Sequence, residues 1–224
     1  MSHNVVVAID GPSGSGKSST SRGVAARLGL RYLDTGAMFR AVTWWLLENG
    51  IDVTDPAAVS AAAGRPVLES GTDPLMPTIV IGGQDASAAI RSGAVTASVS
   101  AVSAVPQVRV RLLDLQRRII GAGGIVVEGR DIGSVVVPDA QVKVYLTADP
   151  ASRALRRAAE EGGSDHGVTE TALLERDRID STRATAPLTM PEGAHHIDTT
   201  AYTLDEVVAL IVDLVKASTG DRDD

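Results

Sequence analysis

The sequence predicts an α/β fold in which a parallel sheet is flanked by helices, and two observations support this prediction. Short runs of Val, Ile and Leu with little polar alternation are typical of strands buried on both faces. These runs alternate with helical patterns, which indicates parallel strands joined by right-handed crossovers. In such a sheet the ligand site lies beyond the carboxyl ends of the strands.

In chain order, the strand-like runs lie at 5–10, 31–34, 125–128, 142–147 and 195–198. Helical patterns lie between and after them, at 17–28, 36–49, 105–121, 150–161, 169–182 and 203–217. The pair His195-His196 falls within the last strand-like run, so we expect packed or edge residues there rather than metal ligands.

Two segments interrupt the alternation. Residues 64–92 are rich in Gly, Pro and Thr, and Thr78-Ile-Val-Ile81 followed by Gly82-Gly83 is a strand-and-turn signature, so we predict a small β-rich insertion. Residues 150–185 are dense in Arg and Glu and are broken at Gly162-Gly163-Ser164-Asp165. We predict a mobile lid of two helices there, with an ordinary surface hairpin as the alternative. The core then comprises 1–63, 93–149 and 186–219, followed by a disordered tail at 220–224.

The composition of the 224 residues limits the classes of partner. The formal net charge of −7 argues against general binding to nucleic acids or anionic membranes. We expect no membrane span, because the first apolar run is far shorter than the roughly 20 residues of a span. We expect no signal peptide, because no charged segment with a small-residue cleavage site accompanies that run. Cysteine is absent, which suits a cytoplasmic protein, and no feature suggests more than a monomer. Of the 21 basic residues 18 are Arg, which suggests a small anionic ligand held in a cleft.

The most informative motif is Gly11-Pro-Ser-Gly-Ser-Gly-Lys-Ser18, which directly follows the first strand-like run. Its spacing is that of a phosphate-binding P-loop. Glycines let backbone N–H groups surround a polyphosphate, and the following helix directs the positive end of its dipole at the same charge. Lys17 can reach the β- and γ-phosphates, and the Ser18 hydroxyl can bind Mg²⁺. The motif predicts a nucleoside triphosphate site without defining the reaction.

Two common classes of nucleotide-binding protein do not fit the sequence. A switch GTPase needs an Asn-Lys-x-Asp motif, and the chain has only Asn4 and Asn49, both in the wrong place. The dinucleotide fingerprint that would begin at Gly14-x-Gly16 needs a glycine where Ser19 stands.

A second motif, Leu33-Asp34-Thr35-Gly36-Ala37-Met38-Phe39-Arg40, leaves the second strand and opens a helix with Asp34 and Thr35 as caps. We expect Arg40 in the first helical turn, directed toward the P-loop, where it can bind the phosphate of an acceptor. The alternative is a capped helix with a solvated Arg.

A third motif, Val127-Glu128-Gly129-Arg130-Asp131-Ile132-Gly133, lies at another carboxyl end of a strand. Arg130 can bind a phosphate, and Asp131 can accept from an exocyclic amine or a ribose hydroxyl. The alternative is a surface Arg–Asp pair, which contributes little stability.

The fourth motif is Glu175-Arg-Asp-Arg-Ile-Asp-Ser-Thr-Arg183, in the predicted lid. Helical spacing places Arg176, Asp180 and Arg183 on one face. Taken alone, this is usually a solvated charged face. After a P-loop, it favours an arginine set that closes over a transferring phosphoryl group.

In this order, the four motifs resemble those of bacterial cytidylate kinases, and the resemblance covers essentially the whole chain. The insertion matches as well, at Gly82-Gly-Gln-Asp-Ala-Ser87 and Ile90-Arg91. The resemblance implies the P-loop nucleoside-monophosphate kinase fold, with a five-stranded parallel sheet, a β-rich acceptor-binding insertion and a helical lid. It also implies the reaction of ATP with CMP or dCMP to give ADP and (d)CDP, with Mg²⁺.

The resemblance further implies roles for individual residues. Those expected to contact cytosine are Thr35, Ser100, Arg109 and Asp131. Asp180 and Arg183 would hold the acceptor's sugar and neighbouring atoms, and Arg40 and Arg130 its phosphate. The expected ATP-binding residues are Gly11, Pro12, Ser13, Gly14, Ser15, Gly16, Lys17, Ser18, Ser19 and one or both of Arg156 and Arg157. The expected catalytic residues are Lys17, Arg130, Arg176 and Arg183.

The chain departs from the family pattern at Phe39, where family members generally carry Tyr, so any role of that hydroxyl is absent. No clear acidic partner of Ser18 for Mg²⁺ is evident, and Asp10 is the candidate, with waters completing the shell. The alternative functions are another small P-loop kinase (adenylate, uridylate, shikimate or dephospho-coenzyme A kinase) and a non-catalytic nucleotide-binding module.

Overall fold

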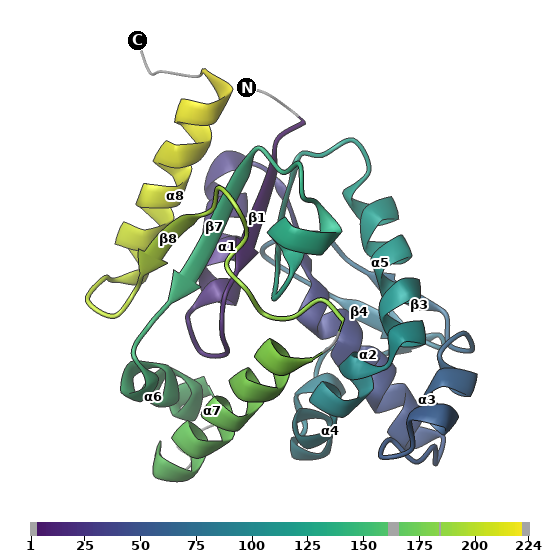
Figure 1. The fold of residues 1–224 in the computed structure, drawn as a ribbon. Coiled ribbons are helices and arrows are strands. Elements are labelled where there is room, and N and C mark those ends of the chain that lie inside the picture. Colours follow the sequence, from purple (N-terminus) through teal and green to yellow (C-terminus); the bar gives the residue numbers. More distant parts are fainter. Residues whose placement is uncertain (1–3, 161–165, 184, 221–224) are drawn as a thin grey trace.

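The central feature of the fold is a sheet of five parallel strands, in the order β2-β6-β1-β7-β8. Figure 1 shows β1, β7 and β8 of this sheet next to one another. The computed structural model describes residues 4–160, 166–183 and 185–220. The strands of the sheet are β1 (Val6–Asp10), β2 (Arg31–Asp34), β6 (Ile125–Gly129), β7 (Val142–Thr147) and β8 (His195–Asp198). Each pair of neighbouring strands in this sheet is parallel, so the predicted α/β fold with a five-stranded parallel sheet is confirmed.

Helices connect and flank the strands. They are α1 (Lys17–Leu28), α2 (Thr35–Glu48), α3 (Pro56–Ala62), α4 (Gly93–Ala104), α5 (Pro106–Ile120), α6 (Pro150–Glu160), α7 (His166–Thr182) and α8 (Leu204–Thr219). The predicted helices do not include α3 and α4. The α4 sequence is a run of small and β-branched residues without the polar face that marks an amphipathic helix. It ends before Pro106, which disfavours helical backbone at the preceding residue.

The two faces of the sheet carry different helices because successive side chains of a strand point to opposite faces. Val6 and Ala8 of β1 belong to a buried cluster that includes residues of α2, α4 and α5. Val7 and Ile9 of the same strand belong to a second cluster with residues of α1 and α8. The sheet is therefore the middle of three layers, which explains why its central strands read as nearly continuous apolar runs.

A second, smaller sheet lies within residues 64–92. Its antiparallel strands are β3 (Leu68–Ser70), β4 (Ile79–Ile81) and β5 (Gln84–Asp85), in that spatial order, and a 3₁₀ turn follows at Ala89–Arg91. The loop between β3 and β4 reaches back to the main sheet, where the Tyr32 N–H of β2 donates to the carbonyl of Thr72 (2.8 Å). The division of the chain into core, insertion and lid stays a prediction.

The segment predicted as a lid contains α6 and α7, which pack together beyond the carboxyl ends of the strands (Figure 1). The predicted break at Gly162-Gly163-Ser164-Asp165 lies outside the described residues. Of the predicted tail at 220–224, only Gly220 is described, and it ends α8 in a left-handed conformation. Within the described parts of the chain, every helix is too short or too polar to cross a lipid bilayer.

Candidate active site

The P-loop connects β1 to α1 in a backbone path that needs glycine. Gly11 and Gly14 have φ angles of 149° and 76°. A Cβ on Gly11 would lie 2.1 Å from the carbonyl oxygen of Leu146, and one on Gly14 would lie 2.8 Å from that of Arg153. Gly16 caps α1 without a side-chain hydrogen bond, so the first N–H groups of the helix face the loop. This arrangement leaves an anion-binding helix end.

Lys17 turns back over the loop. Its Nζ donates to the carbonyl of Pro12 at 2.5 Å and lies 3.5 Å from the Ser15 hydroxyl. Burial lowers the pKa of Lys17, and the positive charge of Arg130 lowers it further. A phosphate bound in the loop would oppose both effects, because a nearby negative charge favours the ammonium form.

The acidic partner of Ser18 is Glu128. The Ser18 hydroxyl donates to one carboxylate oxygen of Glu128 at 3.1 Å, and the Tyr32 hydroxyl donates to the other. Glu128 is buried, and this burial raises its pKa, with a further contribution from the negative charge of Asp34. Glu128 belongs to the third motif, but its contact with Ser18 follows from the order of the strands. Strand β6 pairs with β1 and places Glu128 opposite Ile9, near the start of the P-loop.

Asp10, the predicted candidate for the acidic partner of Ser18, makes other contacts in this structure. Its two carboxylate oxygens accept from the backbone N–H groups of Ile132 and Gly133, at 2.7 and 2.8 Å. These residues begin a π-helical turn over Ile132–Val136, directly after Arg130 and Asp131. Asp10 therefore fixes the turn that positions the third motif. Glu128, on the neighbouring strand β6, accepts the hydrogen bond from Ser18.

Four of the predicted acceptor-binding residues come together in one buried cluster. Arg109 of α5 pairs with Asp131 at 2.5 Å, and Asp131 lies 3.6 Å from Arg183. Arg183 lies 3.7 Å from Asp180 of α7. The Arg109 guanidinium also stacks over the Phe39 ring, 5.3 Å from its centroid. Asp131 thus lies between two guanidinium groups, a position suited to polar recognition of a base.

Arg130 joins this cluster to the P-loop. Its Nη1 donates to the carbonyl of Gly11 at 2.6 Å, and its Nε lies 3.0 Å from the Asp180 carboxylate. The side chain is largely buried. Arg130 is therefore in contact with both the loop predicted for the donor and the cluster predicted for the acceptor.

Arg176 of α7 lies in a strongly cationic environment. Burial lowers its pKa to about 9, and the neighbouring positive charges of Arg130, Arg40 and Arg157 act in the same direction. Its buried Nε has no hydrogen-bond partner among the described residues. Guanidinium groups gathered in this way repel one another, and an anion between them would relieve the repulsion.

The second motif begins α2 as predicted, except that Thr35 is the first helical residue rather than a cap and that Arg40 lies beyond the first turn. The Asp34 side chain caps the helix by accepting from the Ala37 N–H at 2.8 Å. Arg40 is the sixth residue of α2 and therefore lies in its second turn rather than its first. Its Nη1 donates to the carbonyl of Ile90 (3.1 Å) and to the Thr96 hydroxyl (2.9 Å), at the side where α4 begins.

Contacts of Thr35 and Ser100 with cytosine stay predictions. The buried Thr35 hydroxyl donates to the backbone carbonyl of Glu128 at 2.7 Å, which leaves its oxygen as an acceptor. Ser100 is half-buried on α4.

Two residues of the predicted lid, Asp177 and Arg153, contact the P-loop and are not among the predicted site residues. One carboxylate oxygen of Asp177 accepts from the Ser13 N–H at 3.1 Å, and the other pairs with Arg153 of α6. Arg153 also donates to the Ser13 carbonyl at 3.1 Å. Asp177 belongs to the fourth motif, but its contact with Ser13 could not be predicted from the sequence, because it forms only where α7 packs against the P-loop.

A cavity of about 200 Å³ adjoins the P-loop. Residues from the loop, α1, α6 and the segment after β8 line it: Gly14, Ser15, Gly16, Ser19, Thr20, Arg156, Thr199, Tyr202, Thr203, Leu204 and Val207. Of the two candidate arginines, Arg156 lines this cavity, whereas Arg157 is one of the charges that act on Arg176. Thr199 and Tyr202 are not among the predicted site residues, and no recognised motif includes them.

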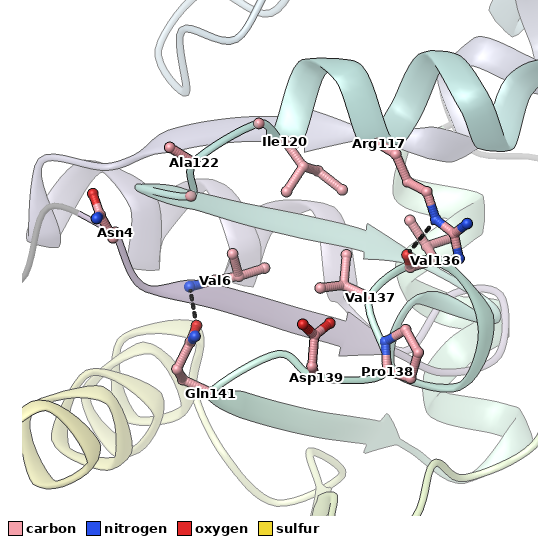
Figure 2. Close-up of a pocket in the computed structure, with 12 residues that line it drawn as sticks. Asn4, Val6, Arg117, Ile120, Ala122, Val136, Val137, Pro138, Asp139 and Gln141 are labelled. Atoms are coloured by element: carbon pink, nitrogen blue, oxygen red, sulfur yellow. Dashed lines mark hydrogen bonds between the residues drawn. The ribbon is translucent and has the colours of Figure 1, made fainter.

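A larger cavity of about 510 Å³ lies at the opposite, amino end of the strands (Figure 2). Its wall includes Asn4 and Val6 at the start of β1 and Gln141 before β7, where the Gln141 side chain accepts from the Val6 N–H at 2.7 Å. None of the predicted site residues line it. The predicted site therefore belongs to the carboxyl end of the sheet.

Comparisons with known proteins agree with this geometry. A family model described as cytidylate kinase matches residues 7–217. A cytidylate kinase from Streptomyces griseus subsp. griseus is 57% identical over 215 residues, which cover 95% of this chain and 93% of that protein. One from Streptomyces avermitilis is 56% identical over 214 residues, with the same coverage. Among solved structures, a gluconokinase from Sinorhizobium meliloti 1021 shares the fold at a TM-score of 0.53 and 16% identity, over 98% of this chain and 97% of the other. The chain therefore belongs to the cytidylate kinase family.

Proposed function

We propose that the protein transfers the γ-phosphoryl group of ATP to CMP or dCMP and releases ADP and the corresponding diphosphate. Family membership favours this reaction over those of the other small P-loop kinases and over a non-catalytic module. The observation that carries the proposal is the position of Arg176. It is a buried guanidinium whose Nε has no hydrogen-bond partner among the described residues, and its charge acts on Lys17 of the P-loop and is itself affected by Arg130 and Asp180. A phosphoryl group in transfer would occupy such a position.

The proposed mechanism depends on placement and charge rather than on covalent chemistry. Phosphoryl transfer needs the donor and acceptor in line, and the acceptor phosphate is already a nucleophile that needs no general base. Two phosphate groups that approach within bonding distance repel each other by several kcal/mol in a poorly screened site. Arg130 and Arg176 would offset this repulsion, with Lys17 acting from the P-loop side.

A magnesium ion fits the residues next to the P-loop. Ser18 and Glu128 offer a hydroxyl and a buried carboxylate 3.1 Å apart, and hard oxygen donors of this kind suit Mg²⁺. The described residues hold no group of three or more His, Asp or Glu side chains that would form a protein cage. Ser18 and Glu128 would therefore hold the ion together with phosphates and water. When bound, it would neutralise charge on the β- and γ-phosphates.

The lid would serve to exclude water. Asp177 and Arg153 hold α6 and α7 against the P-loop, and Asp180 and Arg183 reach the acceptor cluster. A lid that closes over both substrates keeps water from accepting the phosphoryl group. We propose that the protein acts as a monomer in the cytoplasm.

The experiment that tests the function is a coupled assay of ADP release with CMP, dCMP, UMP, AMP and shikimate as acceptors. We expect CMP and dCMP to be phosphorylated with the highest kcat/KM and AMP and shikimate not to react. Equal rates with all nucleoside monophosphates, or a preference for another acceptor, would contradict the proposal.

Replacement of Arg176 tests the observation that carries the proposal. We expect Arg176→Ala to lower kcat at least tenfold, because the charge that stabilises the transferring group is lost. Arg178→Ala is the matched control, since Arg178 lies on the same helix, is exposed and pairs with Glu175. Its kcat should equal that of the wild type. If both variants lost activity equally, the effect would belong to α7 as a whole.

A further inference from the structure

Tyr32 of β2 carries a buried hydroxyl that contacts the carboxylate beside the P-loop. The residue is 2% exposed, and its side chain belongs to the buried cluster that includes Val24 and Ala25 of α1. The hydroxyl donates to Oε1 of Glu128, and among the described residues it has no other hydrogen-bond partner. Tyr32 directly precedes the second motif and is not among the predicted site residues. Its contact with Glu128 therefore gives it a task that no motif marks.

The register of the sheet explains how the two side chains meet. Tyr32 lies opposite Val126 of β6, and Asp34 lies opposite Glu128. Since successive side chains of a strand alternate between the two faces, Tyr32 and Glu128 point to the same face, with Glu128 two residues further along. A long side chain with a donor at its tip is needed to bridge this offset. The phenol of Tyr32 has both the length and the donor.

The two oxygens of the Glu128 carboxylate have different partners. Oε1 accepts from Tyr32, whereas Oε2 accepts from the Ser18 hydroxyl at 3.1 Å. Because Ser18 and Glu128 are the residues that would hold Mg²⁺, Oε2 is the oxygen on the side of the metal. A buried carboxylate oxygen without a hydrogen bond is costly, so Oε1 needs a donor of its own. Tyr32 supplies that donor and leaves the side of the metal open.

The backbone of Tyr32 is held as well. Strand β2 is at the edge of the main sheet, and the Tyr32 N–H donates to the carbonyl of Thr72 in the loop between β3 and β4. The same loop is tied to α1, because Arg22 donates to the carbonyls of Pro74 and Leu75, at 2.7 and 3.2 Å. A side chain can orient its neighbour only if it is itself held by packing and hydrogen bonds. Tyr32 meets this condition at both its ring and its backbone.

We propose that Tyr32 is a positioning residue of the metal site: its hydroxyl fixes the Glu128 carboxylate so that the oxygen facing Ser18 stays available to Mg²⁺. This inference rests on the proposed function and concerns the donor side of the same site. Tyr32 acts through Glu128 and contacts neither the nucleotide nor the ion.

Direct binding of ADP tests the proposal with Tyr32→Phe, which removes the hydroxyl and keeps the ring. Calorimetry measures the dissociation constant of ADP once with EDTA and once with Mg²⁺. With EDTA we expect the value of the variant to stay within about twofold of the wild type, because the P-loop itself is unchanged. With Mg²⁺ we expect it to be about tenfold higher than in the wild type, as for the loss of one hydrogen bond to a charged group.

Two results of this measurement would overturn the proposal. Equal constants of Tyr32→Phe and the wild type with Mg²⁺ would show that the hydroxyl does not serve the metal. An equal rise with EDTA and with Mg²⁺ would show that Tyr32 supports the P-loop rather than the carboxylate.

A double variant shows whether Tyr32 acts through Glu128, even if Tyr32→Phe alone folds poorly. Glu128→Gln removes the buried charge that the hydroxyl serves. Adding Tyr32→Phe to it should therefore change the dissociation constant of ADP with Mg²⁺ by less than about twofold. A further rise of about tenfold would mean that the two residues act independently, against the proposal.

Tyr145→Phe is the matched control. It also removes a hydroxyl from a half-buried tyrosine of the main sheet, on β7, whereas the hydroxyl groups that donate to Glu128 are those of Tyr32 and Ser18. Both of its dissociation constants should equal those of the wild type, and a rise confined to Mg²⁺ and equal to that of Tyr32→Phe would contradict the assignment. A wild type that is inactive with CMP and dCMP would refute the proposed function, whereas an active wild type with an unaffected Tyr32→Phe would refute only this inference.

Discussion

At the scale of single residues, the site depends on two buried carboxylates whose surroundings give them different tasks. Asp10 ends β1 and accepts two backbone N–H groups from the turn after β6. Glu128, on the neighbouring strand, accepts two hydroxyl groups, from Tyr32 and Ser18. A hydroxyl can turn away to let a carboxylate bind a cation, whereas a backbone N–H is fixed in place. Glu128 is therefore the carboxylate that can respond to a metal.

The first prediction concerns this carboxylate. We expect Glu128→Gln to raise the Mg²⁺ concentration for half-maximal activity about tenfold, because an amide oxygen binds a hard cation more weakly than a carboxylate does. A magnesium titration of the coupled assay measures this. Glu69→Gln, at an exposed position on β3, is the control and should have no effect. An unchanged magnesium dependence of Glu128→Gln would refute the assignment.

The second prediction concerns the pH dependence of stability. Burial raises the pKa of Asp10 from 3.8 to about 6, against the opposing effect of its two backbone hydrogen bonds. Between these pH values the folded chain binds more protons than the unfolded chain, so the contribution of Asp10 to stability is complete below about pH 4 and is lost as the pH rises through about 6. The unfolding free energy of the wild type minus that of Asp10→Asn should therefore fall by up to about 3 kcal/mol from pH 4 to pH 7.

Urea unfolding of the two proteins at several pH values measures this difference. The comparison cancels the carboxylates whose pKa is lowered in the folded state, such as Asp52 and Asp198, which act in the opposite direction. A difference that rises with pH would mean that Asp10 is already ionised in the folded chain at pH 4.

At the scale of secondary-structure elements, the contact between α7 and the P-loop decides whether the lid lies over the site. Asp177 is central to this contact, because it pairs with Arg153 of α6 and accepts from the Ser13 N–H. Both contacts link segments that are far apart in the sequence, and both involve a charged group, so they are stronger than neutral hydrogen bonds. Asp177 therefore helps to hold the predicted lid against the loop that would bind the donor.

The third prediction follows from this contact. Asp177→Asn removes the charge from the pair with Arg153, so we expect hydrogen exchange of the described α7 amides, in 170–182, to become about tenfold faster. Hydrogen exchange read by mass spectrometry measures the change. Glu175→Gln serves as the control, because Glu175 lies on the same helix and its exposed side chain pairs with Arg178. Equal protection of Asp177→Asn and the wild type would show that the ion pair does not hold the lid.

At the scale of the whole molecule, two buried clusters on opposite faces of one sheet support the site. Leu33 of β2 is fully buried in the cluster that includes α2, α4 and α5, and it directly precedes the cap residue Asp34. Leu210 of α8, by contrast, is 41% exposed. Packing in the first cluster therefore fixes the end of β2 from which the second motif leaves the sheet.

The fourth prediction compares these two leucines. Leu33→Ala should lower the free energy of unfolding by about 2–5 kcal/mol, because it removes buried methyl groups and leaves a cavity. Leu210→Ala should cost less than about 1 kcal/mol, since much of its side chain is already in water. Urea unfolding of both variants measures the difference. A similar small loss in both would mean that the packing around Leu33 rearranges to fill the space.

The sequence by itself determined what depends on neighbours along the chain. The apolar runs predicted all five strands of the main sheet, and glycine spacing predicted the P-loop, because both are local patterns. The Asp34 cap is local as well. The motifs also supplied most of the residues that meet in the site, although without their partners. The limit appeared at α4, whose uniform composition shows no periodic face.

Only the tertiary structure decided which of these residues meet. Strand order places β6 between β1 and β2, and this brings Glu128 to Ser18, 110 residues away, and leaves Asp10 to the backbone of the following turn. The packing of α6 brings Arg156 onto Thr199, which no motif marks. Such contacts join distant segments, and their geometry follows from the packing of the whole sheet and its helices. The physical reason is that local spacing fixes the conformation of a segment but not its neighbours in space.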